Sequence, residues 1–345
     1  MIRCMNVLFL APPGLDIYKD VIKELECRGF YVDYVSSSDV PKNPFMPIFN
    51  NRYNEENVST FEKSCTDYWR EKLFSQAYLK KYDIFLTING LMVCPFLFQH
   101  LKARNPNIKC KLFLYDKIEY ACRVDRYFSY YDAIFSFDLD DAARYNLRFL
   151  PIYWVPISKP KTKKYDIFGM ASYSLHKKDR ALLFRQIRKI SKKSNMTSHI
   201  KLYVSMKNWP IFFIKNTIKL LTKHKSYIPF RDVFNGLITN KSLSPTVFRE
   251  YIYESDATID THVEYQDGLT ARFMWALGAE KKIITTNKIV KQYEFYSPDQ
   301  FFIIGEDSIS KLNEFINAKF SMSLKTRATI SQYRIDNWLD VILKS

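Results

Sequence analysis

The chain has 345 residues, of which 47% are hydrophobic, so it is long enough for two domains of ordinary size with a core each. Its 52 lysines and arginines outnumber 36 aspartates and glutamates, and the net charge of +16 points to an anionic partner. The sequence lacks a zinc-finger spacing, an arginine-rich arm and an RNA-binding aromatic signature, so we expect no nucleic-acid partner.

The compartment follows from cysteine usage and hydropathy. The six cysteines are scattered without a CxxC or Cys/His spacing, which predicts reduced thiols and no structural zinc. No segment is long and apolar enough to span a bilayer. The apolar run in MIRCMNVLFLAPPG is short and ends in two prolines, which suits a buried strand better than a signal peptide. These features predict a cytoplasmic protein.

Strands and helices alternate through the first half of the chain, which predicts βαβ units and a parallel sheet. The expected strands are 6–10, 31–35, 84–88, 111–115 and 133–137. The expected helices are 17–28, 59–80, 95–104 and 140–145, with a polar insertion at 39–58. Gly29 follows the first helix at the C′ position that favours glycine.

The segment 150–165 is rich in proline and lysine and has no helical period, so we expect it to link two domains. The alternation then resumes. The expected strands are 167–170, 201–204, 283–286 and 301–304, in addition to an apolar run that ends at Asp260. The expected helices are 178–192, 210–223, 245–254 after a Ser244 cap, 269–278, 308–318 and 326–343. We place the domains at 1–157 and 158–325, followed by a last segment at 326–345.

The segment DTHVEYQDGLTARFMWALGAEKKIITTN, residues 260–287, reads as strand, polar loop, helix and strand. A loop of this kind after a buried parallel strand places a helix N-terminus at the carboxyl edge of the sheet. Open α/β sheets bind anionic ligands at that edge, because unpaired helical N–H groups favour phosphate. Arg272 lies one turn into the helix and could add a bidentate phosphate contact.

The loop QDGLTAR, the helix and KKIITTN resemble the donor-side signature of glycosyltransferases that build bacterial lipopolysaccharide and capsule. Four further phrases are similar to that family in order and spacing: YDIFLTING at 82–90, KCKLFLYDKIEY at 109–120, YYDAIFSFDLDDAARYNLRFLPIYW at 130–154 and YDIFGMASYSLHKKDR at 165–180. The resemblance implies the GT-B architecture, an α/β fold with two Rossmann-like domains facing each other across a cleft. It also implies that the last helix crosses back to the first domain.

The resemblance implies a nucleotide-sugar donor on the second domain. The expected donor site combines the loop and helix start after 260, the loop after 167–170 and the end of the next strand: Ser172, Lys177, Arg180, Asp260, Gln266, Gly268, Leu269, Thr270, Arg272, Thr286 and Asn287. Several structural alternatives stay open for these residues. The helix start could be ordinarily capped, the basic loop could be a solvated helix start, and the carboxylate could anchor a loop.

The first domain carries the expected acceptor side, with Gly14 and Asn89 in the loops after the first and third strands. A general base for the acceptor hydroxyl would come from the carboxylates that follow strands at this edge: Asp16, Asp116, Glu119 and Asp138. Asp116 is the preferred candidate, whereas Asp16 could simply cap the next helix. Helix N-termini and basic side chains can stabilise a leaving diphosphate, so we expect no metal and no other cofactor.

The sequence departs from the family pattern at three positions. Trp275 occupies a helix position where the family usually has a glutamate. Gly90 lies after the third strand, where related chains often have a second glutamate. Tyr115 replaces a common tryptophan. These departures leave a shifted donor preference, a different catalytic scheme and a protein that only binds as alternatives.

The segment WPIFFIKNTIKLLTKHK, residues 209–225, has the pattern of a basic amphipathic helix. One face would carry Ile211, Ile214, Ile218 and Leu221, beside a stripe of Lys215, Lys219 and Lys223. Such helices lie on anionic membranes, and a core-packed helix with a solvated lysine face is the alternative. With the +16 charge, the pattern predicts peripheral attachment to the inner face of the plasma membrane.

The sequence therefore predicts a glycosyltransferase that moves a sugar from a nucleotide-sugar donor to a lipopolysaccharide or capsule glycan, including a polyprenyl-linked one. One alternative is a non-catalytic scaffold protein of polysaccharide assembly on the same frame. The other is a sugar-nucleotide epimerase of the same architecture, which would need no glycan acceptor.

Overall fold

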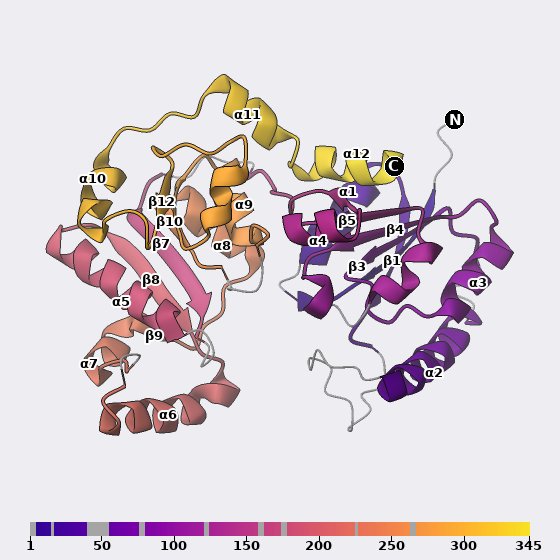
Figure 1. Cartoon of the computed structure of the whole chain (residues 1–345), viewed down its shortest axis with the longest axis horizontal. Coiled ribbons are helices and arrows are strands. Elements are labelled where there is room, and N and C mark those ends of the chain that lie inside the picture. Colours follow the sequence, from indigo (N-terminus) through magenta and orange to yellow (C-terminus); the bar gives the residue numbers. More distant parts are fainter. Residues whose placement is uncertain are drawn as a thin grey trace. The chain divides into compact units, whose positions relative to one another are not determined.

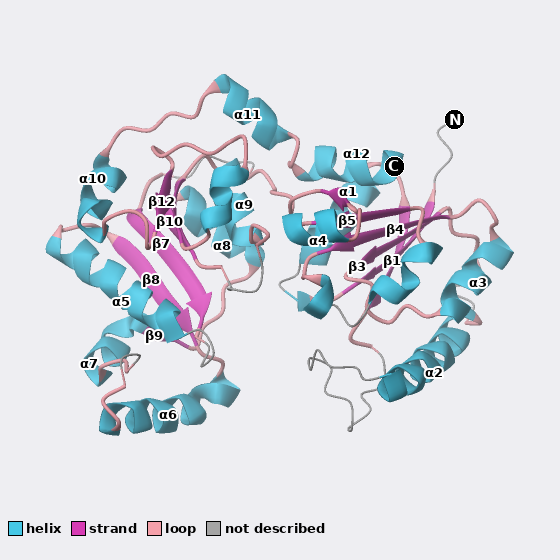
Figure 2. Ribbon diagram, in the orientation of Figure 1, coloured by secondary structure: helices cyan, strands magenta, loops and turns pink. Residues whose placement is uncertain are grey.

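The computed structural model describes residues 5–14, 17–39, 55–75, 80–120, 124–157, 162–173, 178–224, 227–262 and 267–345. The chain divides into two compact units, one of Met1–Ile152 with Ile335–Ser345 and the other of Tyr153–Arg334. Each unit is a sheet covered by helices, as Figure 1 and Figure 2 show. The sequence predicted the first division after residue 157, whereas the structure has it after Ile152. The second was predicted after residue 325, whereas the structure has it after Arg334.

The first unit contains a six-stranded parallel sheet in the order β2-β1-β3-β4-β5-β6. Its strands are β1 (Asn6–Ala11), β2 (Tyr31–Ser36), β3 (Ile84–Ile88), β4 (Lys109–Leu114), β5 (Ala133–Ser136) and β6 (Arg148–Phe149). All five residues of β3 are buried, as expected for a parallel strand covered on both faces. The register aligns Leu8 of β1 with Phe85 of β3 and with Asp33 of β2.

The helices of the first unit are α1 (Ile17–Cys27), α2 (Glu55–Leu73), α3 (Pro95–Arg104), the 3-10 turns η3 (Ile118–Tyr120) and η4 (Val124–Tyr130), α4 (Leu139–Arg144) and α12 (Ile335–Lys344). The buried residues of α1 recur every four positions at Ile17, Val21 and Leu25, which is one helical face. Gly29 ends this helix with φ of +81°, the left-handed conformation expected for it. The helix predicted at 59–80 begins and ends earlier, at 55 and 73.

The second unit contains a six-stranded parallel sheet in the order β12-β11-β10-β7-β8-β9. Its strands are β7 (Tyr165–Ser172), β8 (Ser198–Tyr203), β9 (Ile238–Thr239), β10 (Ser255–Asp260), β11 (Lys282–Thr285) and β12 (Phe301–Ile303). Gly169 lets β7 pack closely, because a Cβ there would lie 2.7 Å from Ile259 Cδ1. The two sheets and their helices make the α/β fold that the sequence predicts.

The helices of the second unit are α5 (Lys178–Lys193), η5 (Met206–Asn208), α6 (Trp209–Leu221), α7 (Phe230–Asp232), η6 (Val233–Leu237), α8 (Pro245–Tyr253), α9 (Ala271–Gly278), η7 (Lys288–Gln292), η8 (Ile309–Lys311), α10 (Leu312–Asn317) and α11 (Leu324–Ser331). Ser244 caps α8 by accepting from the Val247 N–H, as predicted. Among the described residues, no helix has the length and apolar character that crossing a membrane requires.

The prediction of one long helix at 326–343 is wrong. The structure has α11 and α12 instead, separated at residues 332–334. The Tyr333 carbonyl accepts from the Trp154 N–H at 3.0 Å, and Trp154 and Arg334 form a parallel bridge. This carbonyl is thus engaged outside the helix, so the helix ends there. α12 then packs in the first unit, where Trp338 is fully buried and donates to the Pro151 carbonyl at 3.0 Å.

Trp154 also touches the end of α9, through Gly278. A Cβ on Gly278 would lie 2.2 Å from Trp154 Cδ2, and the Trp154 indole N–H donates to the Ile330 carbonyl at 2.9 Å. The ring is therefore held between α9 and α11 with no room for a methyl group.

We predict that Gly278→Ala destabilises the second unit. Overpacking costs about 1–3 kcal/mol and the gain in helix propensity returns at most about 1 kcal/mol, so the net loss is up to about 2 kcal/mol and the unfolding temperature should fall by up to about 8 °C in calorimetry. Gly14→Ala is the matched control, because no atom lies within 4 Å of a Cβ there. Equal stability of the two variants would show that Trp154 moves aside.

Candidate active site

The second sheet has a topological switch point between β7 and β10. From β7 the chain continues outward to β8 and β9, then returns to the other side of β7 to form β10, β11 and β12. Open α/β sheets bind ligands at such a point, outside the carboxyl ends of the strands. Ser172 ends β7 and Asp260 ends β10, so the residues that follow them define the candidate site.

Arg180 of α5 joins the two strand ends. Its Nη1 donates to the Ser172 carbonyl at 3.0 Å and its Nη2 donates to the Thr261 carbonyl at 3.3 Å. The side chain is only 8% exposed, so it holds the edge together and contributes a buried positive charge there. Ser172 itself is exposed at this edge. Lys177, predicted in the same loop, lies outside the described residues.

The start of α9 is fixed by Thr270 and Asp260. Thr270 Oγ1 accepts from the Phe273 N–H at 3.1 Å, as an N-cap does, and donates to Asp260 Oδ1 at 2.7 Å. The carboxylate of Asp260 is 1% exposed, so it anchors the helix start and does not face solvent.

Arg272 extends from the first turn of α9 over the same edge. Its Nε lies 3.7 Å from Asp260 Oδ1, and its Nη1 donates to the Met170 carbonyl at 3.2 Å. The side chain is 24% exposed, in contrast to the buried Arg180. Arg272 is thus oriented by the protein, while part of its side chain stays accessible to a ligand.

The loop before α9 is held by Asn287, two residues beyond the end of β11. Asn287 is 2% exposed and donates through Nδ2 to the Asp267 carbonyl at 3.1 Å, while its Oδ1 accepts from the Ile289 N–H. Asn287 therefore positions the loop. Gly268 is buried and Leu269 is 1% exposed, so the Leu269 side chain belongs to the core and these residues can offer a ligand only backbone groups. Gln266 lies outside the described residues.

His262 is a residue at this edge that the sequence analysis missed. Its Nδ1 lies 2.8 Å from Thr286 Oγ1, and its backbone N–H donates to the same oxygen at 3.1 Å. The available signal was its place two residues beyond Asp260, at the end of a buried strand. The predicted donor residue Thr286 thus orients a half-buried imidazole beside the switch point.

The arrangement suits an anionic ligand. The α9 N-terminus, the partly exposed Arg272 and the buried Arg180 all bring positive charge or N–H donors to the β7–β10 edge. Helix N-termini and arginine are the groups that bind phosphate oxygens in proteins. A diphosphate could therefore be held here by backbone and guanidinium groups.

The first sheet has a corresponding switch point between β1 and β3. Gly14 follows β1, and Asn89 follows β3 with φ of +61°. Asn89 Oδ1 accepts from the N–H groups of Tyr115 at 2.6 Å and Asp116 at 3.2 Å, and its Nδ2 donates to Asp116 Oδ2 at 2.8 Å. Asn89 is only 5% exposed, so it orients the half-buried Asp116 carboxylate.

The other predicted carboxylates have different surroundings. Asp138 is fully buried and caps α4, its Oδ1 accepting from the Asp141 N–H at 3.1 Å. Glu119 is exposed and lies 3.4 Å from Arg144 Nη1. Asp16 lies outside the described residues. Asp116 is therefore the described candidate that is oriented by a neighbouring side chain and is itself only half-buried.

Asp138, Asp140 and Asp141 are close enough to share a metal ion. Besides the Asp138 cap, Asp141 Oδ2 accepts from the Ile118 N–H at 2.7 Å, and Asp140 lies 3.1 Å from Lys117 Nζ. Burial raises the pKa of Asp141, and the neighbouring Asp138 charge raises it further. These contacts explain the cluster as an anchor between α4 and the preceding loop.

Two of the three departures from the glycosyltransferase pattern, Gly90 and Trp275, have packing explanations. Gly90 has φ of +61°, and a Cβ there would lie 2.2 Å from Val124 Cγ2. A glutamate therefore does not fit this loop without rearrangement. Trp275 is 5% exposed, with the Arg249 guanidinium 5.2 Å from its ring centroid and Phe248 packed edge-on. Trp275 thus packs α9 against α8.

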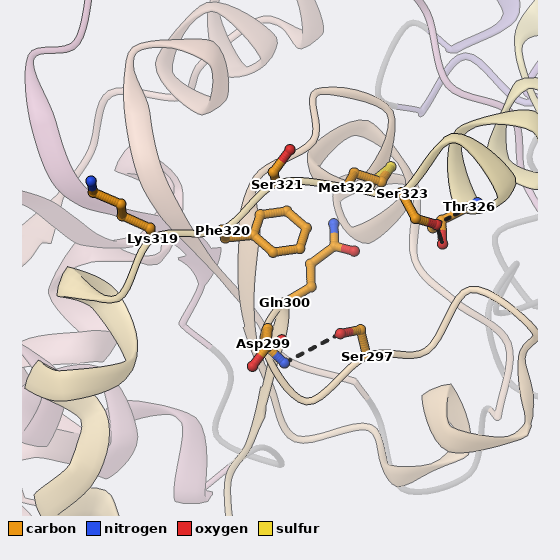
Figure 3. Close-up of a pocket in the computed structure, with 9 residues that line it drawn as sticks. All are labelled: Ser297, Asp299, Gln300, Lys319, Phe320, Ser321, Met322, Ser323 and Thr326. Carbon is orange, nitrogen blue, oxygen red and sulfur yellow. Dashed lines mark hydrogen bonds between the residues drawn. The ribbon is translucent and has the colours of Figure 1, made fainter.

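The second unit also contains a cavity of about 290 Å³, whose lining residues Figure 3 shows. It is lined by Ser297, Asp299, Gln300, Lys319, Phe320, Ser321, Met322, Ser323 and Thr326. Asp299 and Gln300 directly precede β12, so the cavity lies at the amino ends of the strands. It is separate from the switch-point site.

The fold matches solved structures over the whole chain. AviGT4, a glycosyltransferase involved in avilamycin A biosynthesis, has a TM-score of 0.56 at 8% identity, with 99% of this chain and 96% of that chain covered. Arabidopsis thaliana UGT89C1 complexed with quercetin has a TM-score of 0.56 at 11% identity, with 99% of both chains covered.

A UDP-GlcNAc 2-epimerase from Methanocaldococcus jannaschii, in complex with UDP-GlcNAc and UDP, has a TM-score of 0.54 at 9% identity, with 99% of both chains covered. No protein-family model and no curated protein matches the sequence. At these identities the matches show the fold alone, and the predicted GT-B fold is confirmed.

We predict that Thr270→Val lowers the free energy of unfolding of the second unit by about 1–2 kcal/mol, because it removes the cap and a hydrogen bond to a buried carboxylate. Thr270→Ser keeps the hydroxyl and should stay within about 0.5 kcal/mol of the wild type. Urea denaturation of both variants measures the difference. Equal loss in valine and serine variants would refute the role of the hydroxyl.

Proposed function

We propose that this protein is a glycosyltransferase that moves a sugar from a nucleotide-sugar donor to a glycan hydroxyl. The observation that carries the proposal is the β7–β10 switch point, where Arg272 and the α9 N-terminus meet above the anchored Asp260. The GT-B fold supports it, because solved neighbours include a glycosyltransferase and an enzyme complexed with UDP-GlcNAc and UDP.

In this proposal the second unit binds the donor through its diphosphate. The first-turn N–H groups of α9 and the Arg272 guanidinium would stabilise the charge that develops on the diphosphate as the bond to the sugar breaks. Arg180, Asp260 and Asn287 would act as positioning residues, since each is buried and bonded to the edge. These groups supply the charge stabilisation, and we propose no cofactor.

The first unit would provide the general base, Asp116. The acceptor oxygen forms the new bond to the sugar carbon, its proton passes to the Asp116 carboxylate, and the nucleoside diphosphate leaves with the bonding electrons. Asn89 would orient this carboxylate through its 2.8 Å hydrogen bond. A base in this role must be partly exposed, which Asp116 is and Asp138 is not.

As acceptor we propose a lipopolysaccharide or capsule glycan, including one carried on a polyprenyl diphosphate. The support is the likeness of five phrases of the sequence to enzymes of that biosynthesis, together with the net charge of +16. The packing roles of Gly90 and Trp275 remove the reason to infer lost activity from these two departures.

We predict that one member of a panel of UDP, GDP, CMP and ADP raises the unfolding temperature of the chain. A ligand at a hundredfold its Kd adds about 2.7 kcal/mol of stability, or several degrees. Arg272→Ala should abolish most of the shift, because it removes the partly exposed arginine side chain from the edge. Thermal-shift measurements compare both proteins.

Arg327→Ala is the matched control for this panel. Arg327 is exposed and pairs with Glu280 at 2.7 Å, so its loss removes an equal charge from the same unit. It should keep the full shift. The donor-site assignment would be overturned if no nucleotide raises the unfolding temperature of the wild type. It would also be overturned if Arg272→Ala and Arg327→Ala lose the nucleotide shift to the same extent.

We predict that Asp116→Asn lowers kcat by roughly a hundredfold to ten-thousandfold while the nucleotide thermal shift persists. Asp138→Asn is the control, because asparagine caps a helix about as well as aspartate and should change kcat by no more than about twofold. The assay follows nucleoside diphosphate released in the presence of a glycan acceptor. Retained activity in Asp116→Asn would contradict the base, and acceptor-independent turnover of UDP-GlcNAc would favour an epimerase.

A further inference from the structure

The helix α6 turns an apolar row away from the core of the second unit. Its buried residues are Phe212 and Asn216, and Trp209 and Phe213 are partly buried against the same core. The exposed fractions of the apolar row are 48% for Ile211, 62% for Ile214, 52% for Ile218 and 77% for Leu221. At 100° per residue these four lie within an arc of about 80°, opposite Phe212 and Asn216.

The orientation of α6 is fixed by polar contacts on its packed side. Asn216 is fully buried, and it both donates to the Ile228 carbonyl at 2.8 Å and accepts from the Ile228 N–H at 3.0 Å. Lys219 Nζ donates to Tyr173 Oη at 2.9 Å. Rotating the isoleucines inward would break these bonds and leave a buried amide unsatisfied.

The surroundings of this row are cationic. Lys207, Lys215 and Lys223 are exposed on or beside α6. From Arg180 to Arg231 the sequence contains no aspartate or glutamate, although it is rich in lysine and arginine. An exposed apolar row beside exposed lysines matches the chemistry of an anionic bilayer surface, where acyl chains lie beneath phosphate groups.

A second copy of the chain fits this surface less well. Pairing two α6 helices through their isoleucines would bring lysines of both copies together, and α6 itself contains no carboxylate to offset them. α6 has 13 residues, too short to span a bilayer but long enough to lie within its interface.

We propose that α6 docks the protein on an anionic lipid bilayer, with Ile211, Ile214, Ile218 and Leu221 among the acyl chains and Lys215 and Lys223 at the lipid phosphates. α6 follows the carboxyl end of β8 in the chain (Figure 1). Lys219 of α6 donates a hydrogen bond to Tyr173, the residue directly after β7. The docking helix thus lies at the same sheet edge as the switch-point site. The consequence that the sugar acceptor is lipid-borne rests on the proposed function; the docking itself does not.

Co-sedimentation with vesicles tests the docking. The full chain should bind vesicles of phosphatidylcholine with phosphatidylglycerol, and bind phosphatidylcholine alone far more weakly. The double variant I214E/I218E should lose roughly a hundredfold in partitioning, since it removes two inserted side chains. The double variant K215Q/K223Q should lose roughly thirtyfold, at about fivefold per lysine, and the binding should weaken with salt.

Two controls match these changes. Leu324→Glu places an acid on another apolar side chain, 81% exposed on α11. The variant K192Q/K193Q removes two exposed lysines from the end of α5, at the opposite edge of the sheet. Both should bind vesicles within about threefold of the wild type.

Failure to bind anionic vesicles, or equal binding by wild type and I214E/I218E, would overturn the proposal. A dimer in solution that I214E/I218E dissociates would also overturn it, in favour of self-association. The nucleotide thermal shift is measured on the same variants. A retained shift without vesicle binding refutes the docking alone, whereas vesicle binding without any shift leaves the docking and refutes the donor site.

Discussion

At the end of β10, the buried Asp260 carboxylate accepts a hydrogen bond from Thr270 and lies 3.7 Å from Arg272 Nε. A carboxylate buried to 1% exposure is unfavourable unless nearby donors compensate it, and here these donors come from the start of α9. Because Thr270 also caps this helix, the one Asp260 charge fixes both the helix start and the arginine. The anion-binding character of the edge therefore depends on a carboxylate that itself does not face the ligand.

Elements whose limits are set locally could be predicted from the sequence. The strand Ile84–Ile88 is a continuous apolar run, and the helix Pro95–Arg104 begins with proline at its first turn, so both were predicted with their observed limits. The break between α11 and α12 could not be predicted. It depends on the Trp154 N–H reaching the Tyr333 carbonyl, a contact between residues far apart in the chain. Periodicity likewise gave the two faces of α6, whereas Asn216 and Ile228 decide which one is buried.

The site shows the same division between local and distant causes. The strand–loop–helix pattern placed Arg272 near the start of the helix, as observed, but it began the helix at 269 and so did not identify Thr270 as the cap that precedes Ala271. Sequence spacing alone could not separate a carboxylate that caps a helix, Asp138, from one held half-exposed by a distant amide, Asp116. His262 was missed because its significance depends on Thr286, which only the pairing of β10 with β11 brings beside it.

The most direct test of the account is a crystal structure of the full chain with the nucleoside diphosphate that stabilises it most. The account predicts diphosphate oxygens within hydrogen-bond distance of the first-turn N–H groups of α9 and of the Arg272 guanidinium, at about 2.7–3.2 Å. A nucleotide bound instead in the cavity lined by Ser297 and Thr326, at the amino ends of the strands, would contradict it. So would a diphosphate bound to the first unit alone.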